Sequence, residues 1–346
     1  NSDPNGNGQA DEIPLSGGSS VLQQRMNDIY MTLSWFGKPV EAKRAENLPA
    51  LLGSTADGQV YYGPLTDEWK DMVSWWARAW ADGLIDPAFF EQTDAAVKAK
   101  GQAEGDQTIG MFQSPGAFLV VPSEQNEDYI VVPPVTNKEG QTPQWIQYSG
   151  LTRGALAVTN KCEYPEVVLR MADWVYEWQE YDGAIYNMRG EPGVDFFYVD
   201  ENGEQTEQAA IDRKFLVLEY EGFESFEVKR AKTLTPNSGS ATPGIGGGTM
   251  PQVIFPLNDW INLQVEEQLQ PHLVLAFPDV YVAADKVDRA ASLKADLNNV
   301  VSMWTAQIIT GEKSVENDYD EFIEQLKNIG AEEYQQIYQE AYDSWS

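Results

Sequence analysis

The N-terminal stretch of the chain places an oxygen-bearing side chain at every second position. Asp3, Asn5 and Asn7 follow this spacing, and Gly8 comes directly after them. A hard cation such as Ca²⁺ takes about six to eight oxygen ligands, and an EF-hand loop supplies them at this spacing, with a glycine at its sharp turn. The stretch therefore predicts a loop that wraps around a calcium ion.

The rest of the expected ligand shell departs from an EF-hand. The twelfth position of the loop is Pro14, where an EF-hand has glutamate. We expect the backbone carbonyl of Gln9 to add one ligand and the carboxylates of Asp11 and Glu12 to close the shell. No switch element accompanies the loop, so the ion is predicted to be structural. A metal-free turn rich in asparagine and glycine is the alternative.

The charge of the chain and its few cysteines and histidines exclude several classes of function. The formal net charge is −31, so the protein repels phosphate backbones and nucleic-acid binding is not expected. The single cysteine, Cys162, rules out an internal disulfide, and the single histidine, His272, rules out sites that need several histidine ligands. The charge also favours a neutral ligand, although Arg153, Arg189 and Arg213 are candidates for a local basic site.

The 346 residues are too many for one ordinary domain, and their hydrophobic patterns alternate between strands and helices. This alternation predicts an α/β protein of two lobes that ends in a helical segment. No run of about 18 apolar residues predicts a membrane span. The expected strands are 59–62, 108–112 and 129–132, with a hairpin made by 196–199 and the Asn202-Gly203 turn. The expected helices are 21–36, 66–83, one that starts at Pro165, 286–309, 319–329 and 332 to the terminus.

The chain is rich in aromatic residues, with 11 tryptophans and 16 tyrosines. Aromatic rings fill cores, and they also suit the apolar faces of sugars. Those on predicted helix faces are expected to be core residues. They are Trp69, Trp75, Trp76, Trp80, Trp174 and Trp304, with Met171 beside Trp174.

Several stretches along nearly the whole chain resemble the family 1 extracellular solute-binding proteins. Each stretch is a weak signal alone, but their order and spacing together are specific. They are similar to the large oligosaccharide-binding lipoproteins of Gram-positive bacteria and to the alginate-binding proteins. The matching stretches are 3–14, which resembles the calcium loop of that subgroup, and 62–68, 83–90, 159–166, 277–278, 309–311, 320–330, Tyr334 and 341–343.

This resemblance implies a two-lobe fold like that of periplasmic binding proteins, of a type II-like kind, with crossing strands between the lobes. Residues 1–150 are expected to form mainly the C-terminal lobe with the calcium loop, and 151–250 mainly part of the N-terminal lobe. Residues 251–346 are expected to return to the C-terminal lobe, mostly as helices. Members of the family usually have a long segment before this loop. We therefore expect that an N-terminal segment is missing and that the first lobe is incomplete.

The resemblance also implies a function. Such a protein captures an oligosaccharide between its lobes by a hinge movement and delivers it to the permease subunits of an ABC importer. The chain is therefore expected not to be an enzyme and to be a monomer. We expect an extracellular lipoprotein on a bacterial surface, whose signal and anchor are not in this chain.

A sugar-binding cleft needs aromatic rings and a few polar groups that bind hydroxyls. Aromatic residues near loops are the candidates, and packing is the alternative for each of them. Arg189 and Glu191 lie in a stretch that resembles a Gly-Glu-Gly motif of the family, with Pro192 in place of its usual glycine. A surface ion pair is the alternative for these two. The predicted ligand-binding residues are Trp35, Phe118, Trp145, Tyr148, Arg189 and Glu191.

Two other classes of function stay open. A glycoside hydrolase needs two carboxylates about 5–10 Å apart, and no signature selects such a pair among the 54 acidic residues. A Ser–His–Asp hydrolase would have to use His272, and the sequence contains no G-x-S-x-G motif. A non-transport adhesion or regulatory module could use the same fold. A neighbouring permease gene would favour transport over such a module.

Overall fold

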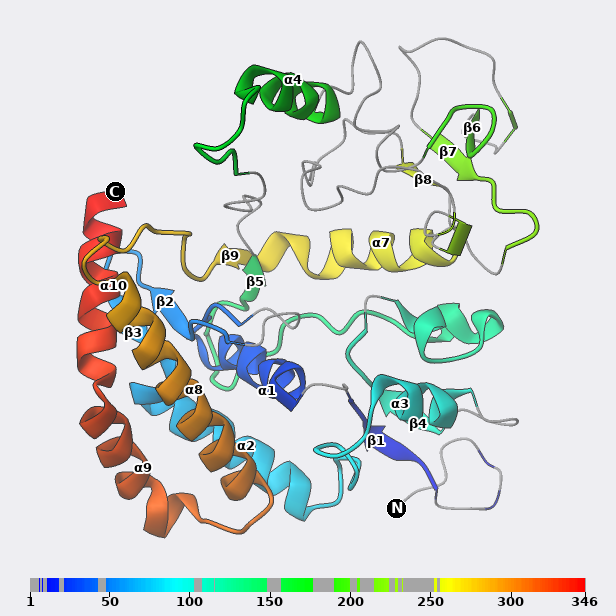
Figure 1. Cartoon of the computed structure of the whole chain (residues 1–346). Helices are drawn as coiled ribbons and strands as arrows, with labels where there is room; N and C mark the ends of the chain where they lie inside the picture. The colour runs from blue at the N-terminus through cyan, green and yellow to red at the C-terminus, as the bar shows by residue number, and fades with distance from the viewer. Residues whose placement is uncertain are drawn as a thin grey trace. The chain divides into compact units, whose positions relative to one another are not determined.

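The computed structural model of the chain has two compact units. Unit 1 consists of Asn1–Tyr148 and Trp260–Ser346, and unit 2 of Ser149–Asp259 (Figure 1). Which unit corresponds to which lobe of a binding protein stays a prediction. The residues that the structure describes are 6, 8, 11–18, 22–42, 48–102, 108–114, 116–147, 157–176, 190–199, 204–205, 215–223, 228–229, 232, 252–253 and 256–345.

Unit 1 is built mainly from helices that lie against one another. Helix α2 contacts both α8 and α9, and α10 contacts α8 and α9 (Figure 1). The predicted helices are confirmed with small shifts at their ends. The helices of unit 1 are α1 (Leu22–Met31), which continues as the 3-10 helix η1 (Thr32–Phe36), α2 (Asp67–Ala81), α3 (Asp94–Gly101), α8 (Val287–Ile309), α9 (Val315–Ile329) and α10 (Ala331–Trp345). Helix α7 (Pro256–Gln268) crosses the boundary between the two units.

The ends of α2 show why these helices begin and end where they do. Thr66 precedes the helix in an extended conformation, and its hydroxyl oxygen accepts a hydrogen bond of 3.3 Å from the backbone N–H of Trp69. Asp67 and Glu68 occupy the first turn, where a carboxylate interacts favourably with the helix dipole. Gly83, with φ of 69°, follows the helix and lets the chain turn away.

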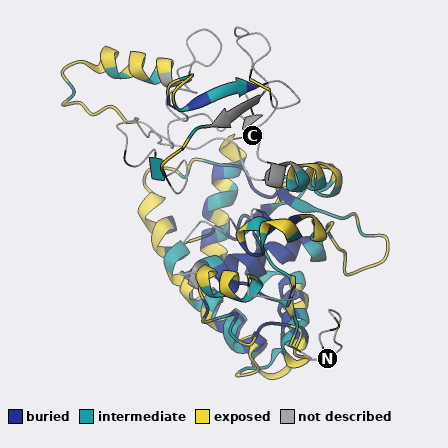
Figure 2. Cartoon of the chain, turned by 90° about the vertical axis from the view of Figure 1, so that its right-hand side faces the viewer, coloured by how far each residue is buried: buried dark blue, intermediate teal, exposed yellow. Residues whose placement is uncertain are grey.

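The core of unit 1 is aromatic. Trp69 and Trp304 are almost completely buried, and the ring of Trp304 lies 5.6 Å from that of Phe322. Figure 2 shows that buried residues gather where the helices of this unit pack together. The prediction of core positions is therefore confirmed for Trp69, Trp304 and Trp76, whereas Trp75 is half-buried.

Short strand pairs accompany this helical core. Each sheet of unit 1 has two strands, and two of the three pairs are parallel. A parallel pair joins segments that are distant in the sequence, because the chain must cross over between the two strands. The pairs are β1 (Ile13–Leu15) with β4 (Ile109–Met111), β5 (Trp145–Gln147) with β9 (Leu273–Leu275), and the antiparallel β2 (Leu52–Ser54) with β3 (Val60–Tyr62). Together with the helices they make the mixed α/β class that the sequence predicts.

The described part of unit 2 contains a small sheet and one helix. Strand β6 (Phe196–Val199) pairs antiparallel with β7 (Phe215–Leu218), and β7 pairs parallel with β8 (Gln252–Val253). Strand β6 is therefore confirmed in antiparallel pairing, while the predicted Asn202-Gly203 turn lies outside the described residues. Helix α4 (Pro165–Tyr176) starts at Pro165, as predicted.

Two of the predictions are wrong. Residues 129–132 do not form a strand, and Ile130 and Val132 are 65% and 49% exposed. No neighbouring strand pairs with this segment in the described chain, and the two prolines that follow it have no N–H to offer. Met171 and Trp174 are not core residues, because they are 56% and 41% exposed on α4.

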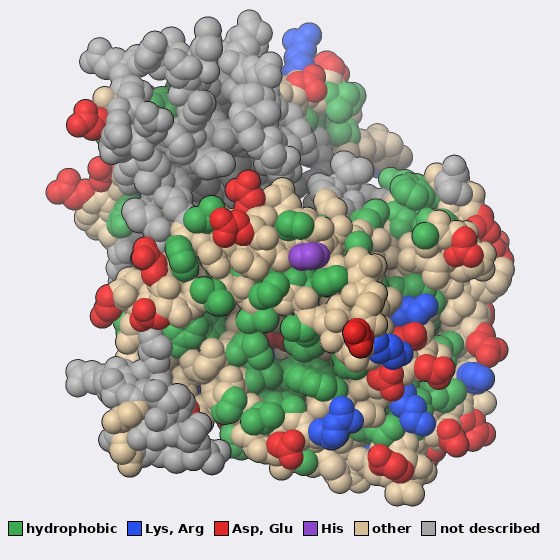
Figure 3. All heavy atoms as spheres, turned by 180° about the vertical axis from the view of Figure 1, so that it is seen from behind, with side chains coloured by type: hydrophobic (Ala, Val, Ile, Leu, Met, Phe, Trp, Pro, Cys, Tyr) green, Lys and Arg blue, Asp and Glu red, His purple; other side chains and the backbone are tan. Residues whose placement is uncertain are grey.

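The surface reflects the acidic composition. On the face shown in Figure 3, acidic side chains are scattered among other residues and Lys and Arg lie between them. Among the described residues, none of the helices combines the length and the apolar character needed to cross a bilayer.

Candidate functional site

The predicted calcium loop is described only in part. Gly6 and Gly8 have φ of 74° and 85°, a left-handed conformation that suits the sharp turn expected at Gly8. Asp11 is exposed and Glu12 is half-buried directly before β1. The other expected ligands, Asp3, Asn5, Asn7 and Gln9, lie outside the described residues. Among the described residues, no three His, Cys, Asp or Glu side chains cluster as a metal site.

The strand that follows the loop is fixed on two sides. The N–H of Ile13 donates to the carbonyl of Thr108 at 2.7 Å, and the N–H of Leu15 donates to the carbonyl of Leu84 at 3.0 Å. The backbone directly after Asp11 and Glu12 is therefore held in place by β1. A fixed backbone at this point suits the role predicted for these two carboxylates in closing a ligand shell.

A buried carboxylate lies next to this strand. Asp86 is 1% exposed, and its Oδ2 accepts hydrogen bonds from Ser16 Oγ at 2.7 Å, Gln92 Nε2 at 2.8 Å and Lys100 Nζ at 2.7 Å. We call these four residues the Asp86 cluster. Gln92 Nε2 also donates to the carbonyl of Gly17 at 2.7 Å, so the cluster holds the chain on the far side of β1.

The protonation of Asp86 follows from these contacts. Burial alone would raise the pKa of its carboxyl group. Hydrogen bonds from Lys100, from Ser16, from the N–H of Ala88 and from Gln92 outweigh that effect and hold the pKa of Asp86 below its ordinary value. Asp86 is therefore an ionised structural group at neutral pH.

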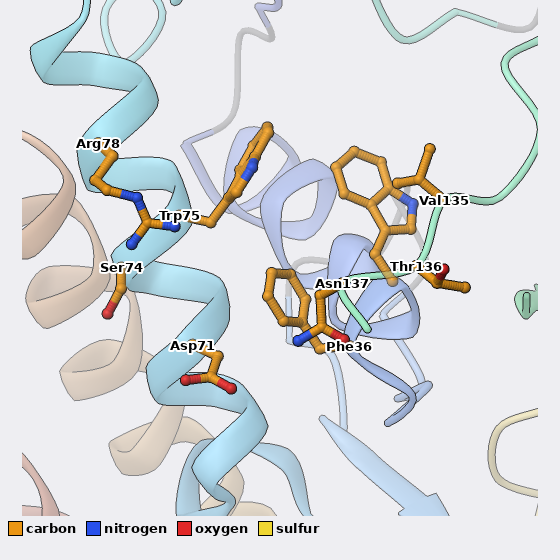
Figure 4. Close-up of a pocket in the computed structure, with 9 residues that line it drawn as sticks. Phe36, Asp71, Ser74, Trp75, Arg78, Val135, Thr136 and Asn137 are labelled. Carbon is orange, nitrogen blue, oxygen red and sulfur yellow. The ribbon is translucent and has the colours of Figure 1, made fainter. Parts of the chain in front are cut away.

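Trp35 lines a pocket inside unit 1. It is half-buried at the end of η1, where Gly37 with φ of 82° ends the turn. The pocket has a volume of about 330 Å³ and combines aromatic with polar side chains. Its lining residues are Trp35, Phe36, Asp71, Ser74, Trp75, Arg78, Val135, Thr136 and Asn137 (Figure 4).

Three segments form the walls of this pocket, and hydrogen bonds join them. In Figure 4, Asp71, Ser74, Trp75 and Arg78 come from α2, and Asn137 comes from a different segment of the chain. The carbonyl of Trp35 accepts from the N–H of Asn137 at 3.1 Å and from the Gln141 side chain at 2.9 Å. Trp76 Nε1 donates to Thr32 Oγ1 at 2.9 Å, which joins α2 to η1.

Three of the other predicted ligand residues, Phe118, Trp145 and Glu191, do not line this pocket. Phe118 is half-buried in a short 3-10 helix (Ala117–Leu119), and Trp145 is half-buried in β5, where it packs against the main core. Glu191 is exposed in unit 2, and its N–H donates to Asp195 Oδ2 at 2.8 Å. Tyr148 and Arg189 lie outside the described residues. The role of all five in ligand binding stays a prediction.

Sequence analysis missed the polar side of the pocket. Asp71, Ser74, Trp75 and Arg78 stand at helical spacings of three, four and seven, so they share one face of α2. The sequence signal was present, because two charged residues flank Trp75 at that spacing. The apolar residues of the same helix indicated only the buried face.

Comparisons with known proteins define the class. No family profile matches the sequence. The chain has the fold of an extracellular solute-binding protein from Bifidobacterium longum subsp. infantis, with a TM-score of 0.77, 19% identity, and coverage of 99% of this chain and 67% of that chain. The fold is thus that of extracellular solute-binding proteins, and the predicted resemblance and two-lobe class are confirmed.

Individual relatives are transport proteins for oligosaccharides. The sequence is 26% identical over 351 aligned residues to the fructooligosaccharide ABC transporter substrate-binding protein FusA of Streptococcus pneumoniae. The match covers all of this chain and 60% of FusA, so the chain spans less than two thirds of that relative. The structure of FusA in complex with kestose matches with a TM-score of 0.65 and 21% identity over 99% of this chain and 65% of FusA.

More distant structures show the same fold. The alginate-binding protein AlgQ2, determined without calcium ion, matches with a TM-score of 0.54 and 15% identity over 95% of this chain and 64% of that protein. All these proteins are binding proteins by name, which agrees with the prediction that the chain is not an enzyme.

Proposed function

We propose that this protein is the extracellular substrate-binding component of an ABC importer and that it captures an oligosaccharide, preferably a neutral one. The observation that carries the proposal is the similarity to FusA over the whole chain. A fold alone does not define a function. Here the sequence of the entire chain, and not only its fold, is similar to that of an oligosaccharide-binding transport protein.

The proposed ligand-binding groups are those that the sequence indicates. Trp35 is supported by its place in a pocket with both aromatic and polar lining. Phe118, Trp145, Tyr148, Arg189 and Glu191 remain candidates. We infer that the protein captures the sugar by closure of two lobes, because contacts from both lobes would favour a closed state. The bound protein would then dock on the permease subunits as a monomer at the outer surface of a bacterial membrane, held there by a lipid anchor.

We infer that the loop before β1 holds a structural calcium ion. Its proposed ligands are Asp3, Asn5, Asn7, the carbonyl of Gln9, Asp11 and Glu12. The left-handed Gly8 and the fixed strand after Glu12 suit a loop that wraps around a cation. One FusA structure is that of an EF-hand mutant in complex with fructo-nystose, so that relative has such a loop.

Calorimetry tests the proposal. Neutral oligosaccharides, including kestose and fructo-nystose, and uronic-acid oligosaccharides are titrated into the protein with calcium present, and the sugars are then analysed for cleavage. Stoichiometric binding of an intact sugar is the expected result. Cleavage would instead indicate a glycoside hydrolase, and the absence of binding by a chain as long as FusA would contradict the carbohydrate assignment.

A further inference from the structure

Two tryptophans of unit 1, Trp35 and Trp75, line the pocket with indole N–H groups that have no hydrogen-bond partner among the described residues, as is also the case for the buried Trp69. The indole N–H groups of Trp76, Trp260 and Trp304 donate to a hydroxyl, a carbonyl and an amide oxygen at 2.9, 2.8 and 2.7 Å. Those of Trp35 and Trp75 make no hydrogen bond in the part of the chain that the structure describes. Both side chains are half-buried and line the pocket. The pocket therefore offers two hydrogen-bond donors on aromatic walls.

The two charged side chains of α2 that line the pocket are also available to a ligand. Asp71 and Arg78 are exposed and lie two turns apart, about 10 Å along the helix axis. Within the described residues, neither side chain forms a hydrogen bond or an ion pair. Between them lie Ser74 and Trp75 (Figure 4). One strong acceptor and one strong donor thus flank an aromatic surface.

The walls of the pocket hold one another in place. Trp35 and Trp75 meet edge to face, with ring centroids 5.7 Å apart and planes at 90°. The hydrogen bonds from Asn137 and Gln141 to the carbonyl of Trp35 hold the second wall in place. A preformed site saves the entropy of ordering its side chains on binding.

These groups match the chemistry of a sugar ring. Hydroxyls both donate and accept, and a ring also has an apolar face that packs on an aromatic side chain. A volume of about 330 Å³ lies at the small end of the range for ligand sites, so one ring fits better than several. Because Asp71 balances Arg78 in a chain of net charge −31, the pocket favours an uncharged ring over an acidic one.

We propose that this pocket is a subsite for one uncharged sugar ring of the captured oligosaccharide. The ring packs on Trp75, and Asp71 and Arg78 bind its hydroxyls and set the specificity. The inference rests on the proposed function, since it assigns a part of that function to named residues of α2.

Three conservative variants test the subsite by calorimetry with kestose, or with the neutral oligosaccharide of the panel that binds best if kestose does not bind. They are Asp71→Asn, Arg78→Gln and Trp75→Phe, which keeps an aromatic ring and removes the indole N–H. Each is expected to weaken binding about tenfold, as for the loss of one well-placed contact. Asp82→Asn is the matched control, because Asp82 is exposed at the C-terminal end of α2 and lies outside the pocket. The affinity of this variant for the sugar should stay within about twofold of that of the parent protein.

The outcomes separate the subsite from the proposed function. If the parent protein binds the sugar and all three variants bind it equally well, the subsite is overturned and the function stands. If Arg78→Gln weakens the binding of uronic-acid oligosaccharides only, the proposal that the subsite takes an uncharged ring is overturned. If neither the parent protein nor a chain as long as FusA binds any sugar, the proposed function fails, and the subsite fails with it. Thermal unfolding of each variant shows whether a loss of affinity reflects a loss of folded protein.

Discussion

Helices α2 and α4 are both amphipathic but have different surroundings. Both carry large apolar residues at helical spacing, among them Trp69 and Trp76 in α2 and Met171 and Trp174 in α4. The first pair is buried, at 0% and 3% exposure, and the second pair is 56% and 41% exposed. The apolar pattern thus predicts that a helix forms, but not that another element covers it. Unit 1 provides α8, α9 and η1 around α2, whereas α4 contacts no comparable partner among the described residues of unit 2.

The largest expected difference between the units concerns tryptophan side chains. Trp304→Ala in α8 should destabilise unit 1 by about 3–5 kcal/mol, because it leaves a cavity in a packed aromatic core and removes the hydrogen bond to Gln325. Trp174→Ala in α4 should change the stability of unit 2 by less than about 1 kcal/mol, since its side chain is already in contact with water. Urea unfolding followed by hydrogen exchange measures both. Equal losses of stability in the two variants would show that Trp174 is covered in α4, and would contradict the difference between the two helices.

Calcium should act on one unit only. Because the proposed site lies next to β1 of unit 1, removing the ion with a chelator should lower the stability of that unit by about 2.7 kcal/mol at a free concentration near 100 times Kd. Asp3→Ala combined with Asp11→Ala should abolish the effect, and Asp82→Ala should preserve it. Hydrogen exchange of the two units with and without chelator is the measurement. A chelator that changes neither unit would contradict the calcium proposal.

The Asp86 cluster should contribute less, and in a pH-dependent way. Asp86→Asn should destabilise unit 1 by about 2 kcal/mol at pH 7, because it removes hydrogen bonds to a buried charge. The folded pKa of Asp86 is lowered, so its stabilisation is complete above the unfolded pKa of about 4 and is lost as the pH falls through the folded value.

Urea unfolding of the parent protein and of Asp86→Asn across this range therefore gives two curves that converge at low pH. Lys100→Met removes the ion pair with Asp86 and should also destabilise unit 1. Lys98→Met is its control, because Lys98 is exposed on the same helix and forms no ion pair with Asp86. A gap between the parent and Asp86→Asn curves that stays constant with pH would contradict the role of the ionised carboxylate.

The smallest expected effect concerns the start of α2. Thr66→Ala removes the hydroxyl that accepts from the N–H of Trp69, and should lower the free energy of unfolding of unit 1 by about 1 kcal/mol. Thr66→Ser keeps the acceptor and should lower this free energy by less. Helix α4 instead starts with a proline, whose fixed φ suits the first helical position and which has no N–H of its own to satisfy there. Thermal unfolding of both variants is sufficient to measure the difference.

Local signals in the sequence predicted the helices well. Thr66 and Gly83 mark the limits of α2, and Gly330, with φ of 116°, marks the end of α9. These signals act through neighbouring backbone groups, so they do not depend on the rest of the fold. The apolar segment 129–132 does not form a strand, because a strand exists only where another strand pairs with it. No local signal in the sequence shows whether such a partner strand is present.

The candidate site was less accessible to sequence reasoning. Trp35 was predicted, because it stands at a helix end, and the structure places it in a pocket. Arg78 and Asp71 were missed, since exposed charges on a helix are usually only solvated. Asp86 lies in the stretch 83–90, which was noted only for its resemblance to the family, and its three side-chain partners lie up to 70 residues away in the sequence. Contacts of that kind depend on the tertiary fold.

The discontinuity of unit 1 constrains how the protein is made. Residues 1–148 leave the ribosome before unit 2, yet Trp304 and the rest of α8 to α10 are synthesised only after unit 2 is complete. Until then, α2 lacks its neighbours α8 and α9, and strand β5 lacks its partner β9. The nascent chain therefore leaves the face of α2 that packs on α8 and α9 uncovered for the whole time that unit 2 takes to emerge, which is when a chaperone or an export factor that keeps the chain unfolded would find its binding surface.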